Sequence, residues 1–193
     1  MANTIIVNAM DESYDGPQVM PDDAAGAREA VRYLRELGYL SIAHVSCDSS
    51  FRGEEKRRGF EEALAGASGQ QTVDGPIEIG SPGIEGGADA SRRILARQPA
   101  CRAFFCATDE AAVGVCMVLR ERGLLPGRDC SVIGFGDTLL AEAEGLMTVG
   151  SNPRRVAEQV LLAVREAATR GSFPRGIFLV KPELRVRASC CRA

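Results

Sequence analysis

Short apolar runs alternate with longer amphipathic segments along the first 145 residues of the chain. The runs rich in β-branched and aromatic residues predict strands at 4–8, 41–46, 76–80, 102–107 and 130–135. The amphipathic segments predict helices at 23–37, 49–66, 86–98 and 109–122. This order, with its short connections, predicts an α/β fold in which a parallel sheet is covered by helices on both faces, a three-layer sandwich.

The spacing of apolar positions also indicates which face of each helix is buried. The predicted inward residues of the three later helices are Ala88, Ser91, Ile94 and Leu95, then Ala112, Val113, Cys116 and Leu119, then Val156, Val160, Leu161 and Val164. This last helix spans 153–170, with Asn152 as its cap, and follows a predicted strand at 146–150. A final pair of strands is predicted at 176–180 and 183–187, the second with Leu184 and Val186 inward.

Polar residues gather where the predicted strands end. In a parallel sheet, ligands meet polar groups at the carboxyl ends of the strands. Here those ends hold Asn8, the 46–52 and 80–85 loops, Thr108–Asp109 and the 134–138 loop. The segment "SVIGFGDTLL" therefore places Asp137 at a rim where several loops converge. Three interpretations compete for it: a phosphate-binding turn, a catalytic acid, or a carboxylate that holds a polar ligand.

The residues favour the third interpretation. "GFGDTL" lacks the third glycine of a dinucleotide-binding turn and comes late in the chain. No GxSxG or P-loop motif is present, and the only histidine, His44, lies on an apolar strand where it is a poor general base. We therefore expect a binding protein rather than an enzyme. Thr108 and Asp109 have a second interpretation, as residues that cap a helix.

Composition narrows the class further. The 193 residues are 45% apolar with a formal net charge of −3, so the chain is globular and has no basic stripe for nucleic acid. No run approaches a membrane span or a signal peptide, which predicts a cytoplasmic protein. The seven cysteines show no zinc spacing, and we expect no metal or cofactor. Cys190 and Cys191 lie in the tail, where oxidation between molecules is the expected risk.

Several blocks of the sequence together resemble the lactose/purine repressor (LacI) family of transcriptional regulators. They are "PDDAAGAREAVRYLRELGYLSIAHVS", "RRGFEEAL", "AFFCATDEAAVGVCMVLRERGLLPGRDCSVIGFGD", "LMTVGSNPRRVAEQVLLAV" and "PELRVRAS", in the order typical of that family. The resemblance implies a periplasmic-binding-protein-like fold of type I, with two α/β subdomains hinged around an effector that is usually a sugar or a nucleobase. It implies binding to DNA only through a helix-turn-helix domain.

The resemblance also implies a partial domain: one complete subdomain plus part of the second. Residues 1–21 are expected to be a remnant of the N-terminal subdomain, and residues 22–145 the C-terminal subdomain. Residues 146–175 are expected to return to the N-terminal subdomain, and 176–193 to form return strands and a tail. The helix-turn-helix domain and the first half of the N-terminal subdomain would then be missing, as in a truncated gene product or a fragment, and apolar surface on the helix 153–170 would be exposed.

The implied effector pocket departs from the family pattern. Gly136 stands where the family has its first acid, and Asp137 at its second acid. Lys56 replaces an arginine, Thr108 an asparagine and Asn8 an aspartate, and the stacking aromatic falls near Pro82. These changes favour a different or smaller effector, or a pocket no longer used. The candidate ligand-binding residues are Asn8, Ser49, Ser50, Phe51, Lys56, Thr108, Asp109, Gly136 and Asp137. Asp137 is either a direct contact or an acid that supports the pocket from behind.

Family members are implied to be homodimers through the C-terminal subdomain. The helix 109–122 and the segment after Asp137 are then the contact surfaces, with Val113, Cys116 and Met117 as either interface or core residues. The leading hypothesis is the effector-binding domain of a transcriptional regulator. A transport-type sugar-binding protein of the same fold and an α/β enzyme using Asp137 or Asp109 are the alternatives. Free cysteines argue against the transport protein, because such proteins work in oxidising compartments.

Overall fold

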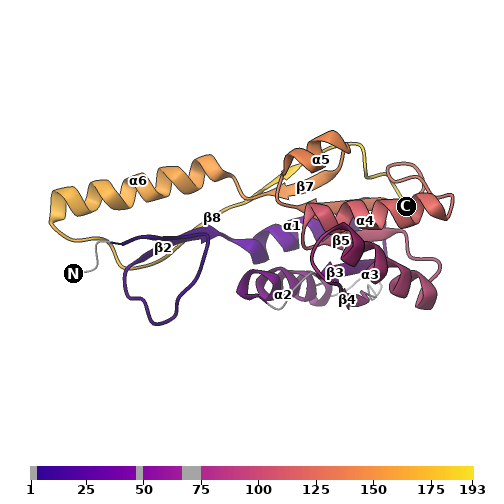
Figure 1. Ribbon diagram of the computed structural model, residues 1–193, viewed down its shortest axis with the longest axis horizontal. Helices are drawn as coiled ribbons and strands as arrows, with labels where there is room; N and C mark the ends of the chain where they lie inside the picture. Colours follow the sequence, from indigo (N-terminus) through magenta and orange to yellow (C-terminus); the bar gives the residue numbers. More distant parts are fainter. Residues whose placement is uncertain (1–3, 47–49, 67–74) are drawn as a thin grey trace. The chain divides into compact units, whose positions relative to one another are not determined.

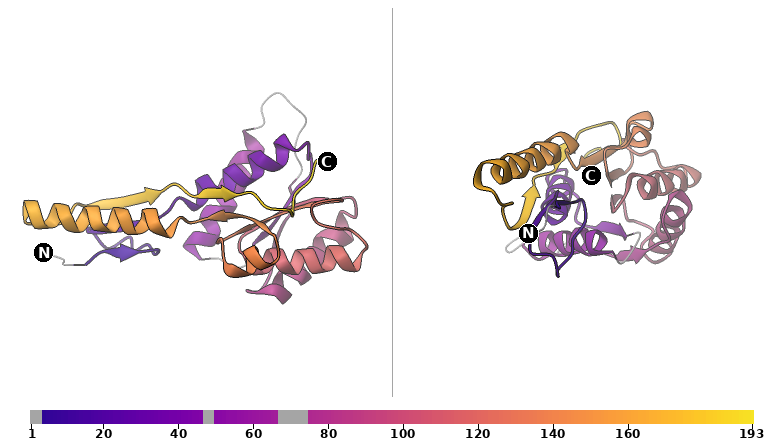
Figure 2. Two further views of the ribbon diagram at one scale, coloured as in Figure 1. Left: turned by 90° about the horizontal axis from the view of Figure 1, so that it is seen from above. Right: turned by 60° about the vertical axis from the view of Figure 1, so that its left-hand side comes forward.

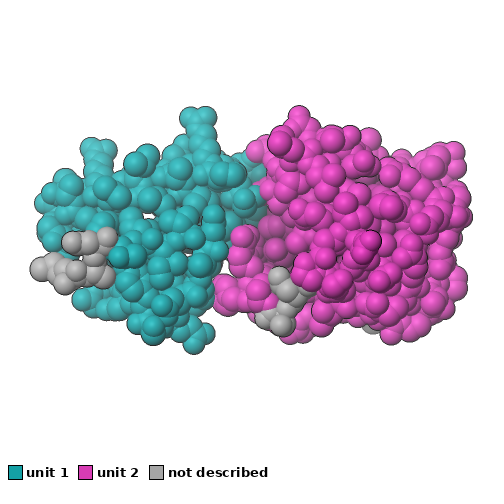
Figure 3. All heavy atoms as spheres, in the orientation of Figure 1, with its two compact units in different colours: residues 1–22, 151–183 teal, residues 23–150, 184–193 magenta. Residues whose placement is uncertain are grey.

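The computed structural model describes residues 4–46, 50–66 and 75–193, which form two compact units (Figure 3). Unit 1 consists of residues 1–22 and 151–183, and unit 2 of residues 23–150 and 184–193. The strand at 146–150, expected to accompany the helix 153–170, instead pairs with its predecessor inside unit 2. The chain therefore leaves unit 2 after Gly150.

Unit 2 is a six-stranded sheet between two pairs of helices (Figure 1). Its strands are β3 (Ile42–Ser46), β4 (Ile77–Ile79), β5 (Ala103–Cys106), β6 (Ser131–Phe135), β7 (Met147–Gly150) and β9 (Glu183–Arg185), in the order β4-β3-β5-β6-β7-β9. Its helices are α1 (Asp23–Glu36), α2 (Phe51–Ala65), α3 (Ile84–Arg97), α4 (Asp109–Glu121) and the short α5 (Leu139–Ala143). The pairs from β4 to β7 are parallel, as predicted.

Two separate apolar cores occupy the two faces of this sheet. Because strand side chains alternate, Phe104 of β5 packs with α3 and α4, whereas its neighbour Phe105 packs with α1 and α2. The predicted inward residues of α3 and α4 are all buried. The three-layer α/β architecture predicted from the sequence is therefore confirmed (Figure 2).

The helices α3 and α4 touch backbone to backbone through glycines. A Cβ atom on Gly114 of α4 would lie 2.0 Å from the carbonyl oxygen of Ile84. A Cβ on Gly87 of α3 would lie 2.2 Å from the carbonyl oxygen of Ala111. Neither position has room for any side chain, so the two glycines set how closely the helices pack.

Unit 1 is a parallel three-stranded sheet, β1 (Ile6–Val7), β2 (Pro17–Pro21) and β8 (Gly176–Val180), with the helix α6 (Pro153–Arg170). Its core joins Val19, Val156 and Val180. Leu161 and Val164, predicted to face inward, are 66% and 46% exposed. The helix has apolar residues on more of its circumference than this sheet covers, so the expected exposed apolar surface is present.

The end of the chain belongs to unit 2. The predicted final pair of strands was wrong, because β8 and β9 lie in different sheets. Val186, predicted to face inward, follows the end of β9 and is 67% exposed. The tail then packs against the sheet: the Ser189 hydroxyl donates to the carbonyl of Val132 at 2.6 Å and accepts from the Met147 amide at 2.8 Å.

The tail cysteines share in this packing. The Cys191 amide donates to Ser131 Oγ, and its thiol lies 3.4 Å from the Tyr39 hydroxyl. Burial raises the pKa of Cys190 to about 11, which keeps this thiol protonated at neutral pH. Because the thiolate is the reactive form, this shift lowers the reactivity expected of Cys190, and oxidation of the tail thiols between molecules stays a prediction.

Candidate functional site

The candidate site lies at the carboxyl edge of the unit 2 sheet. Ser50, Phe51 and Lys56 follow β3, Thr108 and Asp109 follow β5, and Gly136 and Asp137 follow β6. Parallel pairing from β4 to β7 brings the ends of these strands to one edge. Asn8 belongs to unit 1, where it is exposed with a left-handed φ of 59°. Ser49 falls outside the described residues.

Two hydroxyl groups at this edge cap the N-termini of helices α2 and α4. Ser50 Oγ accepts a hydrogen bond from the Gly53 amide at 3.2 Å, and Thr108 Oγ1 accepts from the Ala111 amide at 3.1 Å. Each satisfies a helix N-terminal amide that would otherwise lack an acceptor. The capping interpretation of Thr108 is confirmed, and the same bond holds its side chain at the strand end.

The carboxylate of Asp109 is buried and is used in hydrogen bonds within the protein. It is 0% exposed, and its Oδ2 accepts from both the amide and the hydroxyl of Thr138, at 2.8 and 2.9 Å. Its Oδ1 accepts from the Thr148 hydroxyl at 2.5 Å. A Cβ on Gly134 would lie 2.4 Å from the same Oδ1, so only glycine fits there. The carboxylate thus ties α4 to α5 and β7, and in this conformation no ligand reaches it.

The loop after β6 turns through two residues with positive φ, Gly136 at 142° and Asp137 at 55°. Glycine adopts such a φ freely, and aspartate tolerates it. The Asp137 carboxylate pairs with Arg187 at 2.7 Å and with Arg185 at 3.2 Å. Of the two interpretations of Asp137, the contacts favour an acid that supports the site from behind, since both oxygens already have cationic partners.

Lys56 is a buried cation beneath the edge. Its side chain comes from α2, and the residue is 8% exposed. The ammonium donates to the carbonyl of Ala107 at 3.0 Å and lies 4.5 Å from the centre of the Phe135 ring. A cation over an aromatic face is favourable, more so where water is excluded. Lys56 therefore connects α2 to the ends of β5 and β6.

Phe51 is the predicted site residue that offers an open apolar surface, being 43% exposed at the start of α2. The next residue, Arg52, makes a two-pronged ion pair with the buried Asp23, at 2.6 and 2.8 Å. The residues that sequence reasoning missed are the partners: Asp23, Thr138, Thr148 and Arg187. Of these four partners, only Arg187 could have been suspected from the sequence, because Arg185 and Arg187 place two cations at the end of the predicted strand 183–187.

The surroundings of His44, the one histidine of the chain, make it unsuited to act as a general base. It is 0% exposed and stacks on both Phe60 and Phe105, each ring centre 5.0 Å away, and these two rings also contact each other. Nδ1 lies 3.1 Å from the Phe105 carbonyl, and Nε2 has no hydrogen-bond partner among the described residues. Burial, with smaller effects of Lys56 and Arg57, lowers the pKa of His44 to about 4. The imidazole is therefore neutral in the folded chain at physiological pH.

This lowered pKa predicts that stability falls on mild acidification. Between pH 6.5 and about 4 the unfolded chain takes up a proton on His44 that the folded chain does not, so the free energy of unfolding decreases. The loss attributable to His44 should approach about 3 kcal/mol at pH 4. Urea unfolding as a function of pH, compared between the natural chain and His44→Gln, isolates this contribution.

Proton NMR gives an independent check, because the chain has a single histidine. The imidazole resonance of the folded chain should stay constant down to about pH 5. A midpoint near pH 6.5 would contradict the prediction.

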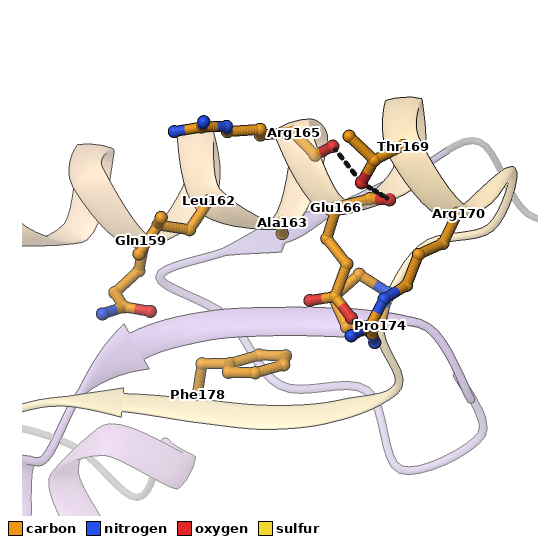
Figure 4. Close-up of a pocket in the computed structure, with 9 residues that line it drawn as sticks. All are labelled: Gln159, Leu162, Ala163, Arg165, Glu166, Thr169, Arg170, Pro174 and Phe178. Atoms are coloured by element: carbon orange, nitrogen blue, oxygen red, sulfur yellow. Dashed lines mark hydrogen bonds and ion pairs between the residues drawn. The ribbon is translucent and has the colours of Figure 1, made fainter.

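A surface pocket of about 490 Å³ lies elsewhere, within unit 1 (Figure 4). Side chains of α6, among them Gln159, Glu166 and Arg170, form one wall, and Phe178 of β8 forms the floor. It contains none of the predicted site residues. No group of three His, Cys, Asp or Glu residues suited to a metal ion occurs in the described part of the chain, and no helix there is long and apolar enough to cross a membrane.

The chain resembles transcriptional regulators along nearly its whole length. It is 32% identical over 190 residues to an uncharacterised HTH-type transcriptional regulator from the aml 5′ region of Streptomyces limosus, covering 96% of this chain and 54% of that protein. The chain thus spans about half the length of this curated relative.

Solved structures agree. A LacI transcriptional regulator from a Rhodococcus species superposes with a TM-score of 0.84 at 25% identity, over 97% of this chain and 69% of that one. The regulator CelR in complex with cellobiose superposes with a TM-score of 0.79 at 25% identity, over 96% of this chain and 58% of that one.

A family model described as the periplasmic binding protein-like domain matches residues 31–190. This match includes α2, α4 and the loop after β6, which carry the candidate site. The chain therefore belongs to the periplasmic binding protein-like domain family, in the form found in LacI-type transcriptional regulators.

Proposed function

We propose that this chain is the effector-sensing part of a LacI-type transcriptional regulator. It binds a small polar molecule at the carboxyl edge of the unit 2 sheet and thereby modulates DNA binding by a helix-turn-helix domain of the whole protein. The observation that carries this proposal is the convergence of Ser50, Phe51, Thr108 and Gly136 on one sheet edge within a sensing-type fold. The cellobiose complex of CelR makes a sugar the first candidate.

The site residues divide into two roles in this proposal. Phe51 offers the apolar ring face on which the CH groups of a sugar pack, and Ser50, Thr108 and the Gly136 backbone line the edge. Lys56, Asp109 and Asp137 act from behind by fixing strand ends and loops. A sugar derivative or a nucleobase has similar hydrogen-bonding groups and belongs in the same search.

A thermal-shift panel of mono- and disaccharides, sugar phosphates, polyols and nucleobases tests the proposal. Binding only to the folded state, at about 100 times Kd, adds about 2.7 kcal/mol and should raise Tm by about 5 to 10 °C for a chain of this size. Phe51→Ala should reduce the ligand-induced shift to less than half while leaving the Tm of the free protein nearly unchanged.

Leu125→Ala is the matched control. Leu125 is 43% exposed, as Phe51 is, but it precedes β6 and so lies toward the opposite edge of the sheet. Its ligand-induced shift should equal that of the natural chain. The proposal fails if no compound in the panel shifts Tm, or if both variants lose the shift equally.

We also propose that the regulator forms a homodimer through α4. Of the predicted contact residues, Met117 is 45% exposed, whereas Val113 and Cys116 are 6% and 5% exposed. Val113 and Cys116 serve the core and line a small pocket with Arg120, so Met117 carries most of the apolar contact. Sedimentation velocity across a concentration series measures this association, and a monomer at all concentrations would contradict it.

A further inference from the structure

The segment 137–146, which contains α5, depends on contacts that hold it at both ends. It begins directly after Gly136 with the left-handed Asp137, so two successive residues have positive φ. Aspartate tolerates such a φ better than most residues, but this φ is still uncommon, and it persists where surrounding contacts hold it. The contacts that hold this segment therefore also fix the backbone of the candidate-site loop at Gly136 and Asp137.

One side chain binds both ends of the segment. The guanidinium of Arg187 donates to Asp137 Oδ1 at 2.7 Å through one nitrogen and to the carbonyl of Leu146 at 3.0 Å through another. Arginine suits this because its N–H groups point along fixed directions. The side chain is 22% exposed, so these bonds are partly shielded from water. The weaker contact from Arg185, at 3.2 Å, comes from a side chain that is 47% exposed.

A second side chain, Asp109, also binds near both ends of the segment, and it lies in the core. Asp109 binds Thr138 near the start of the segment and Thr148 just beyond its end. These Asp109 contacts anchor the segment to α4, which lies entirely within unit 2. The Arg187 contacts differ in origin, because Arg187 lies two residues after β9, the strand that begins where the chain passes from unit 1 into unit 2.

We infer that Arg187 is the positioning residue of the effector loop: it sets the conformation of residues 136–138 by clasping both ends of the 137–146 segment from the tail that follows β9. The inference rests on the proposed function for its meaning, since it assigns the loop to effector contact. The clasp itself is a property of the free protein. It links the loop to the path by which the chain connects the two units.

Hydrogen–deuterium exchange on the full chain without ligand tests the clasp. Arg187→Met keeps most of the side-chain length and removes the donors. Amides of 137–146 should exchange at least 10-fold faster, while those of β5, whose hydrogen bonds lie in the centre of the sheet, should be unchanged. Arg187→Lys, with a single ammonium, should give an intermediate rate. Arg192→Met, an exposed arginine in the same tail, should have no effect.

The pattern of exchange decides the outcome. Faster exchange confined to 137–146 supports the inference. An unchanged rate in that segment overturns it, and so does an equal rise in β5, because that would show only global loss of stability. If Arg187→Met does not fold, the lysine variant supplies the same comparison. The exchange experiment uses no ligand, so a negative result would overturn the role of Arg187 and would leave the thermal-shift test of the proposed function unchanged.

Discussion

Replacing Asp109 by alanine should lower the free energy of unfolding by about 4 kcal/mol. The substitution removes the acceptor for the amide and hydroxyl of Thr138, which are partly buried, and for the fully buried hydroxyl of Thr148. A buried donor without a partner costs about 1 to 3 kcal/mol. Equilibrium unfolding in urea, followed by circular dichroism, measures the difference.

Glu110→Ala provides the control. Glu110 is the next residue in the first turn of α4, so its loss removes the same charge from the same end of the helix. It should cost less than about 1 kcal/mol. Similar costs for the two variants would show that the Asp109 carboxylate does not join α4 to α5 and β7. Asp109→Asn keeps the shape and one acceptor oxygen, and should fall between them.

Gly114→Ala should destabilise the chain by about 3 kcal/mol or more, although alanine favours helices by about 1 kcal/mol over glycine. The added methyl group would meet the carbonyl oxygen of Ile84 at 2.0 Å, and a backbone atom in a helix cannot move aside alone. The helices α3 and α4 would have to separate, and their shared core would be disrupted.

Met117→Ala is the comparison on the same helix. Met117 is 45% exposed, and its replacement should cost less than about 1 kcal/mol. Thermal unfolding of both variants ranks them directly. A Gly114→Ala protein that is more stable than the natural chain would mean that the helices do not approach as closely as described.

The sequence predicted the layers of unit 2 because each strand and helix there has a strong local period. The predicted inward faces of α3 and α4 are buried. The strand β2 was not predicted, since its five residues, PQVMP, begin and end with proline and resemble a loop. Proline is nevertheless compatible with strand ends, and Gln18 is buried there by bonding to the backbone of Asp11 and Tyr14.

The contacts at the candidate site were beyond local patterns. Thr148 is 39 residues from Asp109, and Arg187 is 50 residues from Asp137, and no periodic signal links such pairs. The sequence located the polar residues at strand ends, but it could not show which of them are used internally. That depends on how side chains of α4, β7, the loop after β6 and the tail pack against one another.

The packed tail has a consequence for how the protein is made. A ribosome releases the chain from its N-terminus onward, yet β9 and the residues that follow it supply the last strand of the unit 2 sheet and the Ser189 bonds to Val132 and Met147. Unit 2 therefore cannot complete its sheet until residues 183–191 have left the exit tunnel, and all of unit 1 has been synthesised by then. A chain that stopped before residue 183 would lack β9 and leave the edge of β7 uncovered, and such a nascent product would be a natural target for quality-control proteases.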